Sequence, residues 1–152
     1  MIDLKLLLFS ILIPNLFGIF GNLLGNSSMG FNEIIKPPFS PPGIIFPIVW
    51  LVLYTLMGIS SYIIYMSNSK NKEKALKTYF IQLILNCLWT FLFFNLNLYL
   101  LAFIWILIMI YFVLKMTYQF YKINKTAAYL QIPYLLWLIF ASILTISIYI
   151  LN

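Results

Sequence analysis

The fold is decided by one stretch, KPPFSPPGIIFPIVWLVLYTLMG, which covers Lys36–Gly58. Four prolines fall within six residues at its start, and an apolar run long enough to cross a bilayer follows them at once. Proline holds its own backbone and that of the preceding residue in extended conformations. Within the apolar run, Trp50 and Tyr54 are four residues apart and therefore share one helix face. The stretch predicts a stiff segment leading into a membrane helix with aromatic side chains at its mouth, as at the rim of a binding pocket.

The overall composition excludes an ordinary soluble domain. The chain has 152 residues, of which 64% are hydrophobic and 8% are charged, and its mean hydropathy is +1.02. Soluble domains carry about 25% charged residues. A soluble core of this size cannot bury so much apolar surface, because a folded domain must still present a polar exterior. We therefore predict an integral membrane protein.

Apolar runs give the number of spanning helices, since each needs about 20 mostly apolar residues. Five runs qualify, and little chain is left for a soluble domain: roughly Leu4–Leu24, Gly43–Met66, Lys77–Asn95, Leu98–Tyr118 and Ala127–Leu151. The fold class predicted is an all-α integral membrane protein, a single domain over residues 1–152 built as a bundle of five transmembrane helices. The first loop, Gly25–Pro42, is the only long one, and we expect it to act as a lid.

The charges predict how the chain crosses the membrane. The sequence contains nine lysines, no arginine and three acidic residues, which gives a net charge of +6. Eight lysines fall on one side of a five-helix path and only Lys36 falls on the other. The positive-inside rule then places the N-terminus and the loops at 67–77 and 119–126 in the cytoplasm, and the first loop and the C-terminus outside. The abundance of Ile, Asn and Lys suggests an AT-rich genome, so we expect a bacterial inner membrane.

Missing residue types exclude several functions. The sequence has no histidine, which removes zinc sites of the histidine type, histidine general bases and histidine-ligated haem. No aspartate or glutamate lies inside any of the five runs, whereas ion-coupled transporters depend on ionisable residues within the membrane. We predict no metal site, no required cofactor, no acid–base catalytic group and no nucleic-acid partner.

Aromatic and amide side chains remain as the candidates for function. Trp89, Thr90 and Phe93 follow Asn86 at offsets of 3, 4 and 7 and therefore share its helix face. A second stripe runs through Tyr134 and Trp137. Tryptophans and tyrosines also form belts at the membrane interface, but Trp89 and Trp137 lie well inside their runs. A pocket of such groups is flat-walled and mostly apolar. Its predicted lining residues are Trp50, Tyr54, Asn86, Trp89, Phe93, Tyr134, Trp137 and Ala141.

Four blocks of sequence resemble one known family. They read KPPFSPPG at Lys36–Gly43, FPIVWLVLYTLMG at Phe46–Gly58, QLILNCLWTFLFF at Gln82–Phe94 and AAYLQIPYLLWLIFASIL at Ala127–Leu144. In this order they resemble the translocator protein family, also called TspO/MBR, the tryptophan-rich sensory proteins and peripheral-type benzodiazepine receptors.

The resemblance implies five helices with a ligand pocket under the first loop. It implies binding of porphyrins such as protoporphyrin IX, of haem-related tetrapyrroles and of synthetic benzodiazepine or isoquinoline ligands, and animal members bind cholesterol. It assigns the pocket to the lining residues named above, with Pro41 and Pro42 shaping the lid. Lys36 is placed to reach porphyrin propionates. Family members are often dimers, and Gly21 and Gly25 have a spacing that suits close packing either inside the bundle or in a homodimer.

The sequence departs from the family at two positions that bear on chemistry. The family usually has a Trp-Tyr pair just ahead of the Lys-Pro segment, and Phe31 and Asn32 stand there in this chain. Asn32 cannot relay an electron, which weighs against light-dependent porphyrin breakdown. We therefore expect a receptor or carrier that works by binding, with photo-oxidative porphyrin degradation by Trp50 and Trp137, or a ligand-sensing stress-regulatory interaction, as alternatives.

Overall fold

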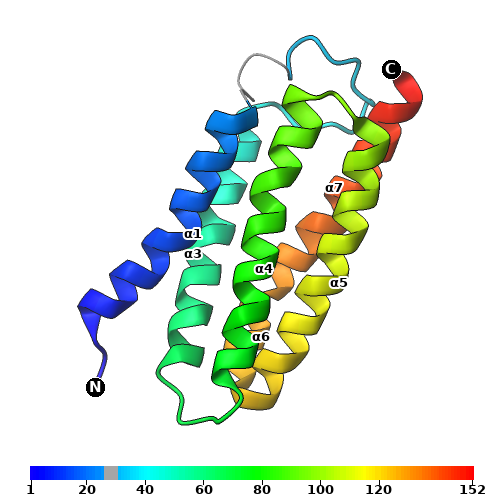
Figure 1. Cartoon of the computed structure of the whole chain (residues 1–152). Helices are drawn as coiled ribbons and strands as arrows, with labels where there is room; N and C mark the ends of the chain where they lie inside the picture. The colour runs from blue at the N-terminus through cyan, green and yellow to red at the C-terminus, as the bar shows by residue number, and fades with distance from the viewer. Residues whose placement is uncertain (26–30) are drawn as a thin grey trace.

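The computed structural model describes residues 1–25 and 31–152 as a bundle of long helices (Figure 1). Within these described residues, five helical segments are long and apolar enough to cross a membrane: Leu4–Gly25, Ile45–Tyr65, Lys72–Asn95, Tyr99–Ile123 and Lys125–Leu151. No strand occurs among the described residues. The predicted fold class, a five-helix membrane bundle, is confirmed. Part of the predicted lid, residues 26–30, lies outside the described residues, and the lid role stays a prediction.

The helices follow one another with short connections along most of the chain. They are α1 (Leu4–Gly25), α3 (Ile45–Tyr65), α4 (Lys72–Thr90) with its π-helical continuation η1 (Phe91–Asn95), α5 (Tyr99–Ile123), the short α6 (Lys125–Tyr129) and α7 (Ile132–Leu151). Helix α1 packs on α3 and α4, α4 packs on α5, and α5 packs on α7. The third and fourth spanning helices are thus antiparallel neighbours joined by a short connection.

The bundle has two distinct ends (Figure 1). The N-terminus, the α3–α4 connection and the α5–α6 connection lie at one end, which we call the lysine-rich end. Residues 31–44, the α4–α5 connection and the C-terminus lie at the other, which we call the loop end. The backbones of α3 and α7 approach each other less closely than those of α1 and α3, and large side chains fill the space between them.

Glycines allow α1 to lie directly against its neighbours. A Cβ atom on Gly58 of α3 would meet the backbone of Ser10 and Ile11 in α1. On α1 itself, a Cβ on Gly21 would lie 3.3 Å from the backbone of Cys87, and one on Gly25 would lie 2.6 Å from Thr90. The Gly21/Gly25 spacing is therefore used for packing inside the bundle, against α4.

The loop expected at Gln119–Thr126 is mostly helix, and that prediction was wrong. Helix α5 continues to Ile123, because this segment has no proline or glycine and buries Phe120 completely. Asn124 breaks the helix with an extended backbone, and its Oδ1 accepts a hydrogen bond from the N–H of Ala127 at 3.1 Å. One residue thus ends α5 and caps α6.

Helix α4 begins at Lys72, a turn before the apolar run predicted from Lys77. The Lys72 side chain explains the early start. Its Nζ donates to the carbonyls of Tyr65 at 3.0 Å and Ser67 at 3.1 Å, and so satisfies carbonyls at the C-terminus of α3. The polar connection between α3 and α4 is thereby tightened into a compact turn.

The contact at Gly58 predicts a steric test of the α1–α3 packing. We expect Gly58→Ala to lower the free energy of unfolding by about 1–3 kcal/mol, because the added methyl group meets backbone that has no rotamer to change. Unfolding followed by titration with sodium dodecyl sulfate in mild detergent measures this. Gly43→Ala is the matched control, since its Cβ would lie 3.8 Å from the nearest atom, in Phe31. Equal stability of both variants would show that α1 and α3 do not approach at Gly58.

Candidate functional site

Aromatic rings from α3 and α7 meet at the loop end of the bundle. The Trp50 ring stacks on Tyr54 with centroids 5.2 Å apart and planes inclined by 26°. Trp50 also meets Trp137 of α7 edge to face at 6.4 Å, and Trp137 meets Phe46 at 5.8 Å. The i, i+4 spacing of Trp50 and Tyr54 thus produces the shared helix face that the sequence predicts. We call Phe46, Trp50, Tyr54 and Trp137 the tryptophan cluster.

A second aromatic group lies on α4 and η1. Trp89 stacks on Phe93 at 5.0 Å with planes inclined by 25°, and Phe94 packs against both rings. The π-helical turn η1 contains Phe93, and such turns occur often at functional sites because they alter the side-chain register. Trp89 and Phe93 therefore form a pair of parallel rings on one wall of the site.

Phe31 connects the two aromatic groups. Its ring lies 5.0 Å from Phe46 and 6.3 Å from Phe94, edge to face in both cases. The Nζ atom of Lys36 lies 4.0 Å from the centre of the same ring, a cation–π contact. A residue of the first loop thus sits between the tryptophan cluster and the Trp89–Phe93 pair. The sequence analysis treated Phe31 only as a departure from the family pattern and missed this packing role.

Below the tryptophan cluster, three helices are joined by a buried chain of hydrogen bonds. The Tyr54 hydroxyl donates to Asn86 Oδ1 at 2.8 Å, and Asn86 Nδ2 donates to the Tyr134 hydroxyl at 2.9 Å. Tyr134 donates in turn to Gln82 Oε1 at 2.8 Å. All four side chains are buried. The three polar residues predicted to line a pocket therefore bind one another across α3, α4 and α7, and Gln82 completes the chain.

Two members of this site were missed by sequence reasoning. Gln82 stands at the start of one of the family-like blocks, four residues before Asn86, so the i, i+4 spacing could have placed it on the same face. Gly18 could not be recognised from spacing. A Cβ on Gly18 would collide with the Tyr54 ring, so the bare glycine on α1 leaves room for that ring to lie between α1 and Trp50.

The indole N–H groups distinguish two half-buried tryptophans. Trp105 donates its Nε1 proton to the carbonyl of Leu85 at 2.8 Å and so fastens α5 to α4. The Nε1 atom of Trp89 is buried, and among the described residues it has no hydrogen-bond partner. An unpaired buried donor beside Asn86 is free to meet an acceptor group of a bound molecule.

The remaining predicted residues take peripheral places. Lys36 and Pro41 are half-buried, Pro42 is exposed, and Ala141 is half-buried on α7, one turn from Trp137. The Pro segment forms turns, with the Ser40 N–H bonded to the carbonyl of Pro37 at 3.0 Å. Their roles at a ligand stay predictions.

Asn152 ties the first loop to the end of α7. The N–H of Ile35 donates to Asn152 Oδ1 at 3.1 Å, and Asn152 Nδ2 donates to the carbonyl of Ile35 at 2.9 Å. This pair of hydrogen bonds resembles one rung of a sheet. It holds the segment that carries Lys36 over the loop end of α7.

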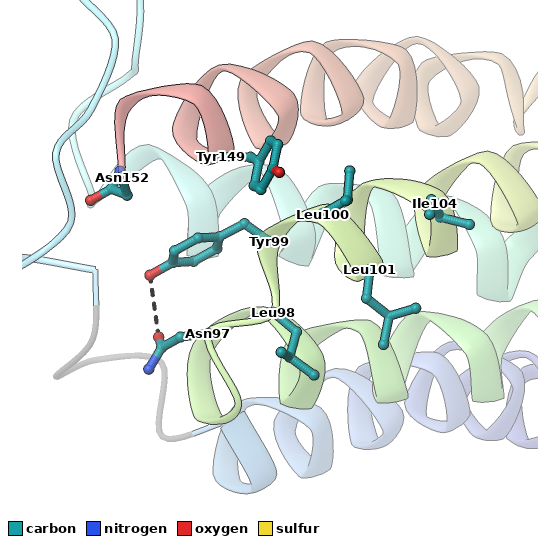
Figure 2. Close-up of a pocket in the computed structure, with 8 residues that line it drawn as sticks. All are labelled: Asn97, Leu98, Tyr99, Leu100, Leu101, Ile104, Tyr149 and Asn152. Carbon is teal, nitrogen blue, oxygen red and sulfur yellow. Dashed lines mark hydrogen bonds between the residues drawn. The ribbon is translucent and has the colours of Figure 1, made fainter.

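A separate hollow of about 580 Å³ lies on the outside of α5 and α7, away from the tryptophan cluster (Figure 2). Its lining residues are Asn97, Leu98, Tyr99, Leu100, Leu101, Ile104, Tyr149 and Asn152. None of the predicted site residues is among them. Because its walls are mostly apolar and lie on a membrane-spanning surface, we regard it as a lipid-facing surface and keep the tryptophan cluster as the candidate site.

Comparison with known proteins identifies the chain's relatives. The profile of the TspO/MBR family matches residues 10–151. The chain belongs to the TspO/MBR family. It is 39% identical to the "Tryptophan-rich protein TspO" of Archaeoglobus fulgidus over 118 residues, which cover 77% of this chain and 76% of that one. It is 33% identical to the "Translocator protein" of Ovis aries over 138 residues, which cover 88% and 82% of the two chains.

A third relative is the "Tryptophan-rich sensory protein" of Cereibacter sphaeroides, 31% identical over 107 residues that cover 70% of this chain and 66% of that one. The resemblance inferred from the four sequence blocks is therefore confirmed. Each of the four blocks contributes to the candidate site of this TspO/MBR member. The first block forms the loop segment, the second carries Trp50, the third carries Asn86 and Trp89, and the fourth carries Tyr134 and Trp137.

The hydrogen-bond chain predicts a stability effect at Asn86. Asn86→Leu removes a partner from both Tyr54 and Tyr134, and we expect it to cost about 1–3 kcal/mol of unfolding free energy. Titration with sodium dodecyl sulfate measures the loss. Thr117→Val is the control, because the Thr117 hydroxyl only donates to Val113 of its own helix at 2.7 Å. A loss at Asn86 no larger than at Thr117 would mean that the chain does not join the helices.

Proposed function

We propose that this protein is a membrane receptor or carrier that binds porphyrins, such as protoporphyrin IX and haem-related tetrapyrroles, at the tryptophan cluster. The observation that carries the proposal is the contact of Trp50 with Trp137 between α3 and α7, beside the Trp89–Phe93 pair. Flat aromatic walls with a few hydrogen-bonding groups suit a planar, hydrophobic ligand. Synthetic benzodiazepine and isoquinoline compounds have the same character and belong to the same ligand class.

The chemistry of the site favours binding. The sequence has three acidic residues, Asp3, Glu33 and Glu73. Only Glu73 lies within a spanning segment, in the first turn of α4. With no histidine in the chain, an iron porphyrin lacks the usual axial ligand, so we expect metal-free porphyrin to bind at least as well as haem. The porphyrin is thus a ligand or cargo, and no resident cofactor is needed.

Entry of a porphyrin requires the first loop to move. Phe31 contacts both Phe46 and Phe94, so we propose that its ring is displaced when a large ligand enters. The described part of the loop contacts the bundle through the rings of Phe31 and Phe39 and through the hydrogen bonds between Ile35 and Asn152, whereas the cation–π contact of Lys36 lies within the loop itself. We propose that these contacts break when a ligand enters, so that the loop acts as a lid. The names of the relatives, which refer to sensing and translocation, agree with a protein that admits a small molecule.

Porphyrin binding at the tryptophan cluster predicts an effect of the tryptophans on affinity. We expect Trp137→Ala and Trp50→Ala to weaken protoporphyrin IX binding in the dark by up to about tenfold, since each removes an aromatic contact with the ring. Titration of the porphyrin absorbance band in mild detergent measures the dissociation constants. Trp105→Phe is the matched control, because its indole serves the Leu85 carbonyl outside the cluster. Equal affinity in all variants, or no saturation, would mean that porphyrin only partitions into the micelle.

The second prediction concerns charge. Lys36 is the single lysine at the loop end, and we propose that its ammonium group meets a porphyrin propionate. Lys36→Gln should weaken binding of protoporphyrin IX a few-fold, as expected for a half-exposed ion pair worth about 0.2–1 kcal/mol. Binding of the uncharged dimethyl ester should not change. A similar loss for both compounds would place the effect of Lys36 in the packing on Phe31.

We also propose that the lysine-rich end faces the cytoplasm of a bacterial cell. The support is the charge distribution, since Lys70, Lys72 and Lys125 lie at that end and Lys36 lies at the other. A reporter active only outside the inner membrane should be active when fused after Asn152 and inactive when fused within the α3–α4 connection. The reverse pattern would contradict this orientation.

A further inference from the structure

The buried polar residues continue past the hydrogen-bond chain toward the lysine-rich end. Helices α4 and α7 both start at that end and run in the same direction, and Tyr134 of α7 meets Gln82 of α4. One turn closer to the lysine-rich end, each helix carries another polar residue, Gln131 before Tyr134 and Tyr79 before Gln82. Gln131 has helical backbone angles, with φ −87° and ψ −13°, so the register of α7 extends back to it. Gln131 and Tyr79 therefore occupy the same level on facing helices.

Helix α3 supplies the third wall of this level. Its Met57 Sδ lies 3.9 Å from Gln82 Nε2, and one turn further on, Ser61 lies beside the Tyr79 hydroxyl. Ser61 gives its own proton to the carbonyl of Gly58 at 2.9 Å. The Tyr79 hydroxyl is left without a hydrogen bond of good geometry to any described residue.

Gln131 and Tyr79 are deeply buried, and their side-chain polar atoms have no hydrogen-bond partner among the described residues. Gln131 has no exposed surface, and neither its amide oxygen nor its amide nitrogen has a hydrogen-bond partner among the described residues. Tyr79 is 1% exposed. An unpaired amide and an unpaired hydroxyl are costly in a membrane protein, where surrounding lipid offers no hydrogen bonds. A side chain with both a donor and an acceptor, next to a hydroxyl, is a site for a small molecule that both donates and accepts.

We propose that a water molecule binds between the Gln131 amide and the Tyr79 hydroxyl. Water fits because no charged residue is among the buried residues described, so the site has no means of holding an ion. The side chains that precede both residues by about one turn are small: Ala75 precedes Tyr79, and Ala127 and Ala128 precede Gln131. A buried water needs two to four polar partners, and this level supplies the Gln131 oxygen and nitrogen and the Tyr79 hydroxyl.

The bound water links α4 to α7 at the lysine-rich end. The hydrogen-bond chain from Tyr54 through Asn86 and Tyr134 to Gln82 then has this water one helical turn beyond its end. The water site is independent of which ligand the tryptophan cluster takes, so its test does not depend on porphyrin binding.

A double-mutant cycle tests the water site. Gln131→Met and Tyr79→Phe, alone and combined, are unfolded by titration with sodium dodecyl sulfate in mild detergent. Each single change should raise the unfolding equilibrium constant. In the double variant, that constant should rise by about threefold less than the product of the two single increases. Gln131→Met combined with Tyr62→Phe is the control. The Tyr62 hydroxyl accepts from the N–H of Asp3 at 2.9 Å and shares no partner with Gln131, so those effects should multiply.

Two results would overturn the proposal. If Gln131→Met raises stability, the amide is unpaired in the native protein. If the effects at Gln131 and Tyr79 multiply independently, no molecule is shared between them. A measurement on the unchanged protein covers the case in which a variant fails to fold. Nuclear magnetic resonance should show cross-relaxation between the Gln131 side-chain amide protons and water, and a visible amide without that signal would contradict a bound water.

Discussion

The structure depends on the buried hydrogen bonds that run from Tyr54 through Asn86 and Tyr134 to Gln82. In a bilayer, apolar side chains gain nothing by leaving lipid for one another, so burial alone gives helices little reason to associate. Polar side chains differ, because their partners must be found inside the protein. Each donor in this chain points to the next acceptor, and the chain connects α3, α4 and α7. It therefore sets the mutual register of the three helices that surround the candidate site.

The tryptophan cluster follows from this arrangement. Tyr54 is anchored through its hydroxyl to Asn86, and its ring carries the Trp50 ring above it at 5.2 Å. Gly18 of α1 makes room for the Tyr54 ring, so a residue on another helix helps to determine where Trp50 lies. The position of the aromatic wall is thus a consequence of one hydrogen bond and one missing side chain. Ligand affinity should be sensitive to both, although neither has to touch a ligand.

Close packing and loose packing are divided between the two sides of the bundle. On the α1 side, Gly21, Gly25 and Gly58 bring backbones together, which leaves no space for a ligand. Between α3 and α7, the backbones stay apart and aromatic rings fill the gap. Rings that contact one another edge to face can be displaced by a flat ligand that offers them equivalent contacts. Among the described residues, side chains and not backbone contacts therefore fill the space between α3 and α7, next to the loop segment that carries Phe31 and Lys36.

The sequence alone determined the membrane class, the five spanning helices, the family and the helix faces that carry Trp50, Tyr54, Asn86 and Trp137. These properties depend on composition, run length and i, i+4 spacing, all of which are local along the chain. Only the tertiary structure decided which faces meet. Gln82, Gly18 and Phe31 gained their roles from partners on other elements of the fold, Tyr134, Tyr54 and the Phe46 and Phe94 rings, and no local pattern encodes such pairings. The helical continuation of α5 to Ile123 was decided in the same way, because Phe120 could pack into a core supplied by other helices.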